Sequence, residues 1–477
     1  MYSCGDASAK PDVTSSSDTE SSSESAETIA TELKDSLPDD LDYGQKTITM
    51  FVNGSLSYNE FDVETSDGDI VNDAIWNRNR DVSERLNVNF AFVKEPGLWA
   101  DRLNFAKKIS KSISANESAY DIVAGYSMAV ATLAANGMLT DLTGTKYIDL
   151  EKPWWSKNLM DQSSVGGKLY FASGDISDSL LYNMMAILFN KELMADNNIE
   201  EPYQLVFDGK WTLDKLIELS TGVYRDLNGN SKKDVDSDIF GLYLWHVYPD
   251  AFFYASGLRT TEMNADGIPE ISPLFGSEKT QALLEKLCGF LYDTNDAIFV
   301  GDDAELKHCY FETGRFMFSP HEILYTATNL RNSEFDYGIL PMPKYDETQE
   351  EYYTTASFPY TLYGIPADAP DADMSSAVLE ALASESSRTV MPAVFEVTLK
   401  VKYSSDDSAA QVYDIIRNSM TYDFGRVFTE NMDTLTYLLF RGAVNENNTN
   451  WMSIYARNKN TLEKKMNKLT NKFTEQE

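Results

Sequence analysis

The pentapeptide Tyr120-Asp121-Ile122-Val123-Ala124, followed by Gly125, has the apolar run of a buried β-strand that ends at a glycine. Upstream of it, the chain alternates between strand and helix patterns. Strands are predicted at Thr47–Val52, which is β-branched and apolar, and at 88–92, where Val88, Phe90 and Phe92 alternate; helices are predicted over 71–86 and 98–115. This βαβαβ order predicts an α/β fold with a mainly parallel sheet and helices on both faces.

Ligands of such sheets bind beyond the carboxyl ends of the strands. Tyr126 and Ser127 directly follow Gly125, so we expect them near a binding site. A second α/β set begins near residue 180. Strands are predicted at 187–189 and 241–245, and helices at 191–198 and 280–291. A further helix is predicted to begin after Thr212, which is its N-cap. The last hundred residues have mostly helical patterns.

The charge of the chain restricts its partners. The 477 residues carry 75 acidic and 40 basic side chains, a formal charge of −35. Nucleic acid is therefore excluded as a partner, and an anionic membrane surface is disfavoured, because neither can be bound without clustered Lys and Arg. Residues 1–44 hold eleven acids, two lysines and a Ser/Thr-rich run at 14–28, which predicts a disordered, self-repelling spacer.

Cys4 gives that spacer a purpose. The start Met1-Tyr2-Ser3-Cys4-Gly5, followed by an acidic Ser-rich stretch, resembles the mature start of a bacterial lipoprotein. This resemblance implies acylation of Cys4 and a domain held by a lipid anchor on the outer face of a Gram-positive-type cell membrane; an exposed free thiol is the alternative. Cys288 is predicted to be a core thiol, and a disulfide to Cys309 is left open.

A calcium loop is predicted at residues 226–236. Oxygen-bearing side chains recur at alternate positions around a glycine, a spacing that lets one loop wrap a hard cation. The expected ligands of a structural Ca²⁺ are Asp226, Asn228, Asn230, the carbonyl of Lys232, Asp234 and Asp236. The alternative is an Asx-rich turn that needs no ion.

The sequence holds 7 Trp, 27 Tyr and 24 Phe, and aromatic faces stack on sugar rings while carboxylates and amides bond the hydroxyls. Motifs for nucleotide binding, nucleophilic serine chemistry and zinc proteases are absent, and His246, His308 and His321 are too dispersed to predict a metal site. A pair of carboxylates for glycoside hydrolysis is always available among so many acids, so composition alone leaves that activity open.

Several segments resemble the family 1 extracellular solute-binding proteins of ABC importers. The matching stretches are Tyr120–Val123, Gly166–Tyr170 followed by Asp175, Leu188–Leu193, Gly209–Thr212, Phe311–Met317, Leu340–Lys344, and Ser387–Ala393 continuing to Leu399–Tyr403. The resemblance covers about residues 45 to 475 and rests on the order and spacing of short pieces. The Asp226 loop also resembles a calcium loop of some polysaccharide-binding members of this family.

The resemblance implies a type II, maltose-binding-protein-like fold with two α/β lobes, a hinge and an interlobe cleft. We divide the chain into a disordered tether at 1–44, lobe 1 at 45–172, lobe 2 at 173–305, a return to lobe 1 at 306–358 and a mostly helical part of lobe 2 at 359–477. Aromatic or carboxylate side chains after strands are the expected cleft residues; they are Tyr126, Trp155, Asp175, Trp245, Tyr248 and Tyr360.

The function implied is capture of an oligosaccharide and its delivery to an ABC transporter permease, without catalysis and as a monomer. Three alternatives remain open at this point. The chain could be a secreted glycoside hydrolase or lyase, a surface glycan-binding protein that serves no transporter, or a binding protein of the same fold for peptides or other small molecules.

Overall fold

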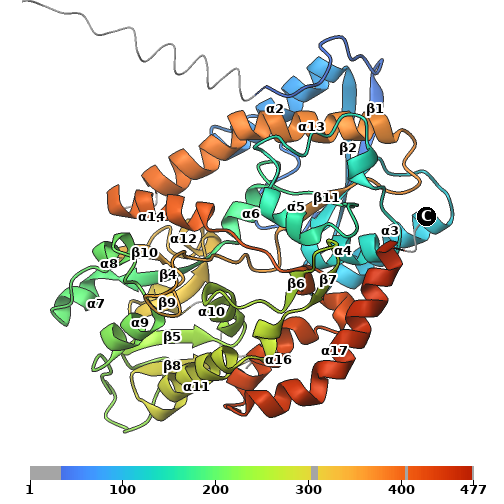
Figure 1. The fold of residues 1–477 in the computed structure, drawn as a ribbon. Coiled ribbons are helices and arrows are strands. Elements are labelled where there is room, and N and C mark those ends of the chain that lie inside the picture. Colours follow the sequence, from blue (N-terminus) through green and yellow to red (C-terminus); the bar gives the residue numbers. More distant parts are fainter. Residues whose placement is uncertain (1–33, 302–309, 403–406, 475–477) are drawn as a thin grey trace, which may run out of the picture.

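The computed structural model describes residues 34–301, 310–402 and 407–474. One part, lobe 1, is built on a four-stranded sheet in the order β11-β3-β1-β2. In this sheet β1 (Lys46–Asn53), β2 (Val88–Glu95) and β3 (Ile122–Tyr126) are parallel, whereas β11 (Thr361–Gly364) is antiparallel to β3. The predicted βαβαβ unit is confirmed, and it lies at the upper right of Figure 1.

Lobe 2 is built on a five-stranded mixed sheet, at the left of Figure 1. Its order is β10-β4-β9-β5-β8. β5 pairs in parallel with β8 and with the central strand β9, and β4 is antiparallel to β9 and β10. The bounds are β4 (Met185–Asn190), β5 (Phe240–Trp245), β8 (Ala297–Val300), β9 (Phe316–Glu322) and β10 (Tyr337–Pro341).

Helices cover both sheets. Lobe 1 has α2 (Ile70–Leu86), α3 (Arg102–Ser114), α4 (Ser127–Ala135) and α13 (Ala372–Arg388); lobe 2 has α7 (Lys191–Asp196), α8 (Tyr203–Phe207), α9 (Leu213–Ser220), α10 (Pro249–Ala255), α11 (Glu278–Asp293), α14 (Asp407–Asn418) and α16 (Leu435–Asn445). Local chemistry sets their ends. Thr212 caps α9 as predicted, because its hydroxyl accepts the Lys215 N–H at 3.2 Å.

Two segments cross between the lobes and pair with each other. The first leads from the short helix α6 (Asp178–Tyr182) into β4, and the second leads from β10 back to β11. The Met185 N–H donates to the Thr355 carbonyl at 2.9 Å, and the Ser357 N–H donates to the Asn183 carbonyl at 2.8 Å. This paired ribbon is the hinge that the fold was expected to contain.

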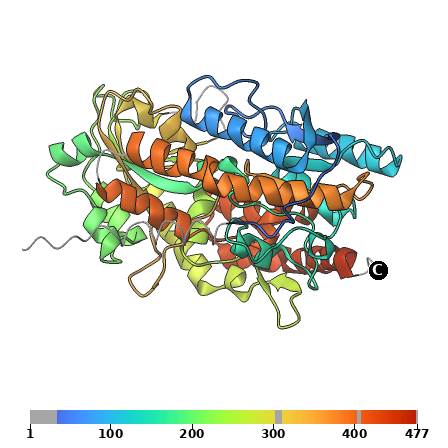
Figure 2. The ribbon, with the colours of Figure 1, turned by 90° about the horizontal axis from the view of Figure 1, so that it is seen from above.

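Two C-terminal elements also span the lobes. The run from α13 on lobe 1 to α14 on lobe 2 passes through the π-helical segment Pro392–Lys402. On the other side, α17 (Trp451–Thr474) begins in lobe 2, where the Trp451 indole donates to the Phe275 carbonyl at 2.7 Å. It ends beside lobe 1 (Figures 1 and 2). There the ring centroids of Phe473 and Tyr170 lie 5.5 Å apart.

The expected division of the C-terminal half is corrected by these sheets. Residues 306–358 do not return to lobe 1, because β9 and β10 both lie in the lobe 2 sheet. Residues 359–477 are not all lobe 2, because β11 is an edge strand of lobe 1 and α13 packs on α2. The start of lobe 2 moves from residue 173 to about 183, since Ala172 still pairs with Tyr363 of β11.

The packed domain also begins earlier than expected. Residues 34–44 were assigned to the tether, but Asp35 and Leu37 are buried against lobe 1. The Arg85 guanidinium donates to both Asp35 carboxylate oxygens at 2.7 Å, and the Tyr43 N–H donates to the Leu86 carbonyl at 3.0 Å. The acidic composition of 1–44 concealed this contact, because one of its acids neutralises a helix arginine.

Two of the three cysteines, Cys4 and Cys309, lie outside the described residues, as does His308. Cys288 is a buried free thiol on α11, and burial raises its pKa to about 11, so it is the core thiol predicted. Within the described ranges, the structure contains no helix with the length and apolarity needed to cross a bilayer.

Candidate functional site

A cavity of about 510 Å³ lies between the lobes, where the cleft-facing edges of the two sheets meet. Lobe 1 contributes Trp99 and Tyr126, lobe 2 contributes Trp245 and Tyr248, and the second crossing segment contributes Phe358. Carboxyl ends of β3, β5 and β9 converge here, which is where ligands bind in open α/β sheets. We therefore treat this interlobe cavity as the candidate site.

One wall combines aromatic rings with a carboxylate. Trp245 ends β5 and is partly exposed to the cavity, and its ring meets Tyr248 edge-on with centroids 5.4 Å apart. The Tyr248 hydroxyl donates to Glu322, the last residue of β9, at 2.7 Å. Burial and the neighbouring Glu322 charge raise the pKa of Tyr248 well above its usual value. The wall therefore presents a flat apolar face beside a fixed hydrogen-bond acceptor.

The second wall holds a buried charge cluster. Asp250 on α10 pairs with Arg426, and it accepts hydrogen bonds from Arg441 Nε at 2.9 Å and Nη2 at 2.6 Å. Burial would raise the pKa of Asp250, but Arg441 and Arg426 outweigh it and hold that pKa below its usual range. The four charged side chains that line this cavity, two arginines with Asp250 and Glu322, compensate one another.

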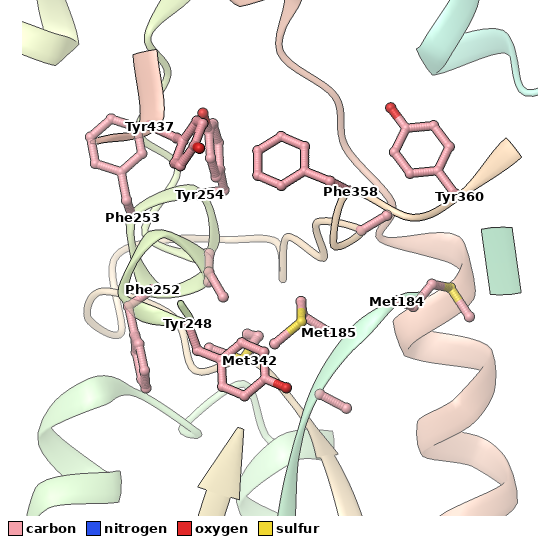
Figure 3. Close-up of a cluster of buried hydrophobic side chains, with 14 of the residues drawn as sticks. Met184, Met185, Tyr248, Phe252, Phe253, Tyr254, Met342, Phe358, Tyr360 and Tyr437 are labelled. Atoms are coloured by element: carbon pink, nitrogen blue, oxygen red, sulfur yellow. The ribbon is translucent and has the colours of Figure 1, made fainter. Parts of the chain in front are cut away.

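Arg426 also ties this wall to the hinge. Its Nη2 donates to the Ala356 carbonyl at 3.1 Å, and its guanidinium lies 3.9 Å from the ring centroid of Phe358. Figure 3 shows Phe358 and Tyr360 on the second crossing segment, above Met185 and Tyr248. A C-terminal arginine thus fixes the crossing segment that forms the back of the site.

Trp99 stands at the rim of the cavity and is 48% exposed. The Arg102 guanidinium stacks 3.8 Å from its ring centroid and also donates through Nε to Glu430 at 2.6 Å. Leu438 of α16, 44% exposed, lines the same cavity. An exposed aromatic face on lobe 1 is therefore held opposite an apolar side chain of the C-terminal region.

The cavity continues into two others along the cleft. A cavity of about 280 Å³ shares Trp245, Tyr248 and Glu322 with it and extends to Tyr58 and Thr328. A third, of about 530 Å³, shares Tyr58 and Thr328 with the second, and it lies between the start of α2 and α12 (Leu324–Ala327). Because each cavity shares lining residues with the next, the three adjoin along the cleft, and together they are called the groove below.

The structure brings together only half of the expected cleft residues. Tyr126, Trp245 and Tyr248 line the interlobe cavity. Trp155 and Asp175 line a separate cavity of about 300 Å³ on the other side of α6, where the Trp155 indole donates to Glu380 at 2.9 Å. Tyr360 is buried at 4% exposure, and its carbonyl accepts the Ser127 N–H. These three residues do not line the interlobe cavity described above, since a loop position after a strand does not specify which side of the sheet the side chain faces.

Further residues that line the cavity and that the sequence did not indicate include Trp99, Asp250, Glu322 and Arg426. A usable signal existed for Glu322, which lies shortly after the apolar run Phe316–Phe318. Asp250 and Arg426 had none, because they are 176 residues apart and become a pair only in the fold.

The predicted calcium loop lies between α9 and β5. The Asp226 carboxylate accepts hydrogen bonds from the N–H groups of Gly229 and Ser231, both at 2.7 Å. The Asn228 side chain accepts the Asn230 N–H, and the Asn230 side chain accepts the Lys232 N–H. Asp236, the last of the expected ligands, is exposed, as are Asn228 and Asn230, and its N–H donates to Asp234 at 3.0 Å. The buried carboxylate facing the loop is Asp238, which accepts the Asp234 N–H at 3.0 Å.

The donor set of this loop is compatible with Ca²⁺ only in part. In the described ranges, no three Asp, Glu, His or Cys side chains come together in a way that could hold a metal ion. An ion here would depend on amide and carbonyl oxygens, from Asn228, Asn230 and Lys232, with few carboxylates. Such neutral oxygens suit a hard cation, and few carboxylates imply modest affinity.

Several solved structures are similar in fold to this chain. The chain aligns over 90% of its length with 99% of the cyclic alpha-maltosyl-1,6-maltose binding protein from Arthrobacter globiformis, at TM-score 0.60 and 14% identity. It aligns over 90% with 99% of an ABC substrate-binding protein from Listeria monocytogenes in complex with cycloalternan, at TM-score 0.54 and 14% identity. For a cyclo/maltodextrin-binding protein complexed with maltotetraose, coverage is 90% and 97%, the TM-score 0.56 and identity 13%.

No family model matches the chain, and no curated protein sequence does. At 13–14% identity the structural similarity defines the fold. The chain has the two-lobed, maltose-binding-protein-like fold of solute-binding proteins, as expected from the sequence.

The charge cluster should control the stability of the site. We predict that Asp250→Asn destabilises the protein by about 3–5 kcal/mol at neutral pH, because it leaves two buried guanidinium groups unpaired. The Asp250 pKa is lowered by folding, so its stabilisation is present above the unfolded pKa of about 4 and is lost as pH falls below it. Urea unfolding as a function of pH checks both effects.

Asp208→Asn is the matched control, because Asp208 pairs with Lys210 at 3.5 Å and is 42% exposed. This exposed pair should contribute less than about 1 kcal/mol. Equal losses in the two variants would contradict a dominant role for the buried cluster.

Proposed function

We propose that the chain is an extracytoplasmic solute-binding protein that captures an oligosaccharide in the interlobe groove and delivers it to an ABC transporter permease. The observation that carries this proposal is the groove itself, with Trp245, Tyr248 and Trp99 beside mutually compensated charges. Aromatic faces suit sugar rings, and compensated charges suit a polar, uncharged ligand. The neighbours of similar fold are described as binding cyclic maltosyl-maltose, cycloalternan and maltotetraose.

The extent of the groove favours a chain of sugar units over a monosaccharide. Its first cavity alone is within the usual size of a small-molecule site, and two more continue from it. Because both lobes and the hinge line the groove, a ligand bound there bridges the lobes and favours their closed arrangement. A closed form that differs from the open form gives a permease a means of recognising the loaded protein.

Glycoside hydrolysis is the main competing function. It needs one carboxyl group that acts as an acid and a second that acts as base or nucleophile. Asp250 and Glu322 both line the cavity, but Asp250 is bound by two arginines that hold its pKa low. Both oxygens of that carboxylate are already paired with guanidinium groups, which leaves neither free to attack a sugar or to activate water, so we propose binding without turnover.

We predict that affinity depends on the length of the sugar chain and on the Trp245 ring. In a thermal-shift panel from disaccharides to heptasaccharides, the shift should increase up to about a tetrasaccharide, because ligands that bind only the folded state stabilise it. Trp245→Ala should lower the affinity for the best ligand by about 10- to 100-fold, because it removes ring stacking.

Trp76→Ala is the control, since Trp76 is partly buried on the outer helix α2, under Arg80. It should leave affinity unchanged. The absence of a shift with every sugar would contradict carbohydrate binding, and new reducing ends during incubation would replace the proposal with a hydrolase.

We also propose that the loop at 226–236 binds a structural Ca²⁺ through Asp226, Asn228, Asn230, the Lys232 carbonyl, Asp234 and Asp236. It connects α9 to β5, so an ion there would stabilise the strand that carries Trp245. Millimolar CaCl₂ should raise the melting temperature of the protein by a few degrees. Asp226→Asn should abolish this effect, whereas Asp208→Asn, which changes an exposed carboxylate outside the loop, should retain it. Calorimetry without heat on calcium addition would refute the site.

We propose a lipid anchor on Cys4, with the acidic segment before residue 34 as the spacer to the packed domain. The support is compositional, since that segment is Ser/Thr-rich and acidic. Expression with its native leader in a Gram-positive host should give an N-terminal peptide whose mass includes a diacylglyceryl group on Cys4. Recovery of that peptide with a free thiol, or of a Cys4→Ala variant in the membrane fraction, would contradict the anchor.

A further inference from the structure

A buried carboxyl pair lies beside the hinge and has no part in the proposed binding chemistry. Glu60, on the loop between β1 and α2, is 2% exposed. Its carboxylate accepts hydrogen bonds from four hydroxyl groups that converge on it, those of Thr361 at 2.7 Å, Ser177 at 2.8 Å, Tyr363 at 2.9 Å and Ser179 at 3.3 Å. Glu60 thus links its loop to the segment before the hinge and to β11.

The second member of the pair, Asp178, lies among these hydroxyl groups and is 2% exposed. No side chain that the structure describes donates a hydrogen bond to its carboxylate; the nearby donors are the backbone N–H groups of Asp178 itself and of Ser179, and neither reaches it with good hydrogen-bond geometry. The positive charge near both acids is Arg78 of α2, which donates to the Glu60 carbonyl, the Ser386 hydroxyl and the Asn79 amide. Two buried carboxyl groups therefore share one cation that hydrogen-bonds to neither carboxylate.

This arrangement distinguishes the two acids. Burial raises the pKa of both acids, but the four hydroxyl donors at Glu60 favour its anion, whereas Asp178 has only poorly aligned backbone donors and burial favours its neutral acid. Burial raises the pKa of Asp178 well above its usual value, and the adjacent Glu60 raises it further. The other titratable groups facing the pair are Tyr58, Tyr363 and Arg78; the pKa of both tyrosines is also raised by burial.

The pair is connected to the binding groove at two points. Tyr58, two residues before Glu60, lines the second and third cavities. Its ring packs on Tyr182 with centroids 4.9 Å apart, and Tyr182 is the last residue of α6, the helix that Asp178 begins. The hinge residue Asn183 follows at once, and its side chain donates to the Ser179 carbonyl at 2.8 Å. A change at the pair therefore acts directly on a groove aromatic and on the hinge.

We infer that Asp178 is kept as a neutral carboxylic acid and that the Glu60–Asp178 pair is a positioning element, which holds Tyr58 and the first crossing segment in their binding arrangement. Ionisation of Asp178 would place a second negative charge in this buried cluster and loosen Tyr58 and the first crossing segment. The effect on ligand affinity rests on the proposed function, whereas the protonation and the ordering of the hinge do not depend on it.

The sign of the pH dependence follows from this assignment. An acid whose pKa is higher in the folded state retains its proton there while the unfolded chain loses it, so stability falls as pH rises from about 4 to the folded pKa. Asparagine in place of Asp178 imitates the neutral acid and cannot ionise. Asp178→Asn should therefore flatten this fall and exceed the wild type in melting temperature by roughly 2–6 °C at mildly alkaline pH.

The test compares wild type, Asp178→Asn, Glu60→Gln and the control Asp161→Asn, whose side chain is 60% exposed on α5 (Lys157–Ser163). Melting temperatures are measured across mildly acidic to alkaline pH without ligand. Glu60→Gln should melt lower at every pH, because an amide offers one acceptor oxygen to the four hydroxyls. Asp161→Asn should follow the wild-type curve. A curve for Asp178→Asn parallel to the wild type would overturn the neutral assignment.

Hydrogen exchange of residues 54–62 and 177–185, corrected for intrinsic rates, tests the positioning role without a ligand. Exchange should accelerate with rising pH in the wild type and remain constant in Asp178→Asn; equal behaviour of the two would overturn the positioning role. With maltotetraose as the probe, the wild type should lose affinity with rising pH relative to Asp178→Asn. If neither binds maltotetraose while the exchange result holds, maltotetraose is excluded as the ligand and this inference is supported.

Discussion

Two backbone hydrogen bonds, from Met185 to Thr355 and from Ser357 to Asn183, join the segments that cross between the lobes. They place the cleft-facing edges of two separate sheets against one another. Trp245 and Glu322 end strands of one sheet, Tyr126 ends a strand of the other, and all three meet at this ribbon. Because rotation about a short paired ribbon changes the separation of the lobes without breaking either sheet, the same contact supports both a binding site and its closure.

Two buried clusters of charged side chains lie against the ribbon, one on each side of it. On the groove side, Arg426 donates to the Ala356 carbonyl and is neutralised by Asp250, so a strong cation is placed at the hinge without attracting an anion. On the lobe 1 side, Glu60 accepts hydrogen bonds from four hydroxyl groups, while no described side chain donates to Asp178. The first cluster is compensated and makes the site rigid. The second has one arginine for two acids and is balanced only while Asp178 keeps its proton, which makes the hinge responsive to protonation.

The sequence predicted what local pattern determines. The periodicity of 47–124 specifies β1, β2, β3, α2 and α3, and Thr212 caps its helix as its position before Leu213 indicates. Trp245 and Tyr248 were identified because they follow an apolar strand. Lobe membership after residue 306 was not predictable in this way, because β9, β10 and β11 are apolar strands whose partners are set by long-range pairing. Trp155 shows the same limit, since its indole bonds to Glu380, 225 residues away.

A central claim connects these parts: a sugar chain is held between the lobes, in contact with both sheets and the ribbon. A crystal structure with maltotetraose, or with the oligosaccharide that gives the largest thermal shift, tests it most directly. Sugar rings should lie against the Trp245 and Tyr248 side chains, and the ligand should contact lobe 1 through Trp99 or Tyr58. Sugar bound in the separate cavity beside Trp155 and Asp175, or on the surface of one lobe alone, would contradict it.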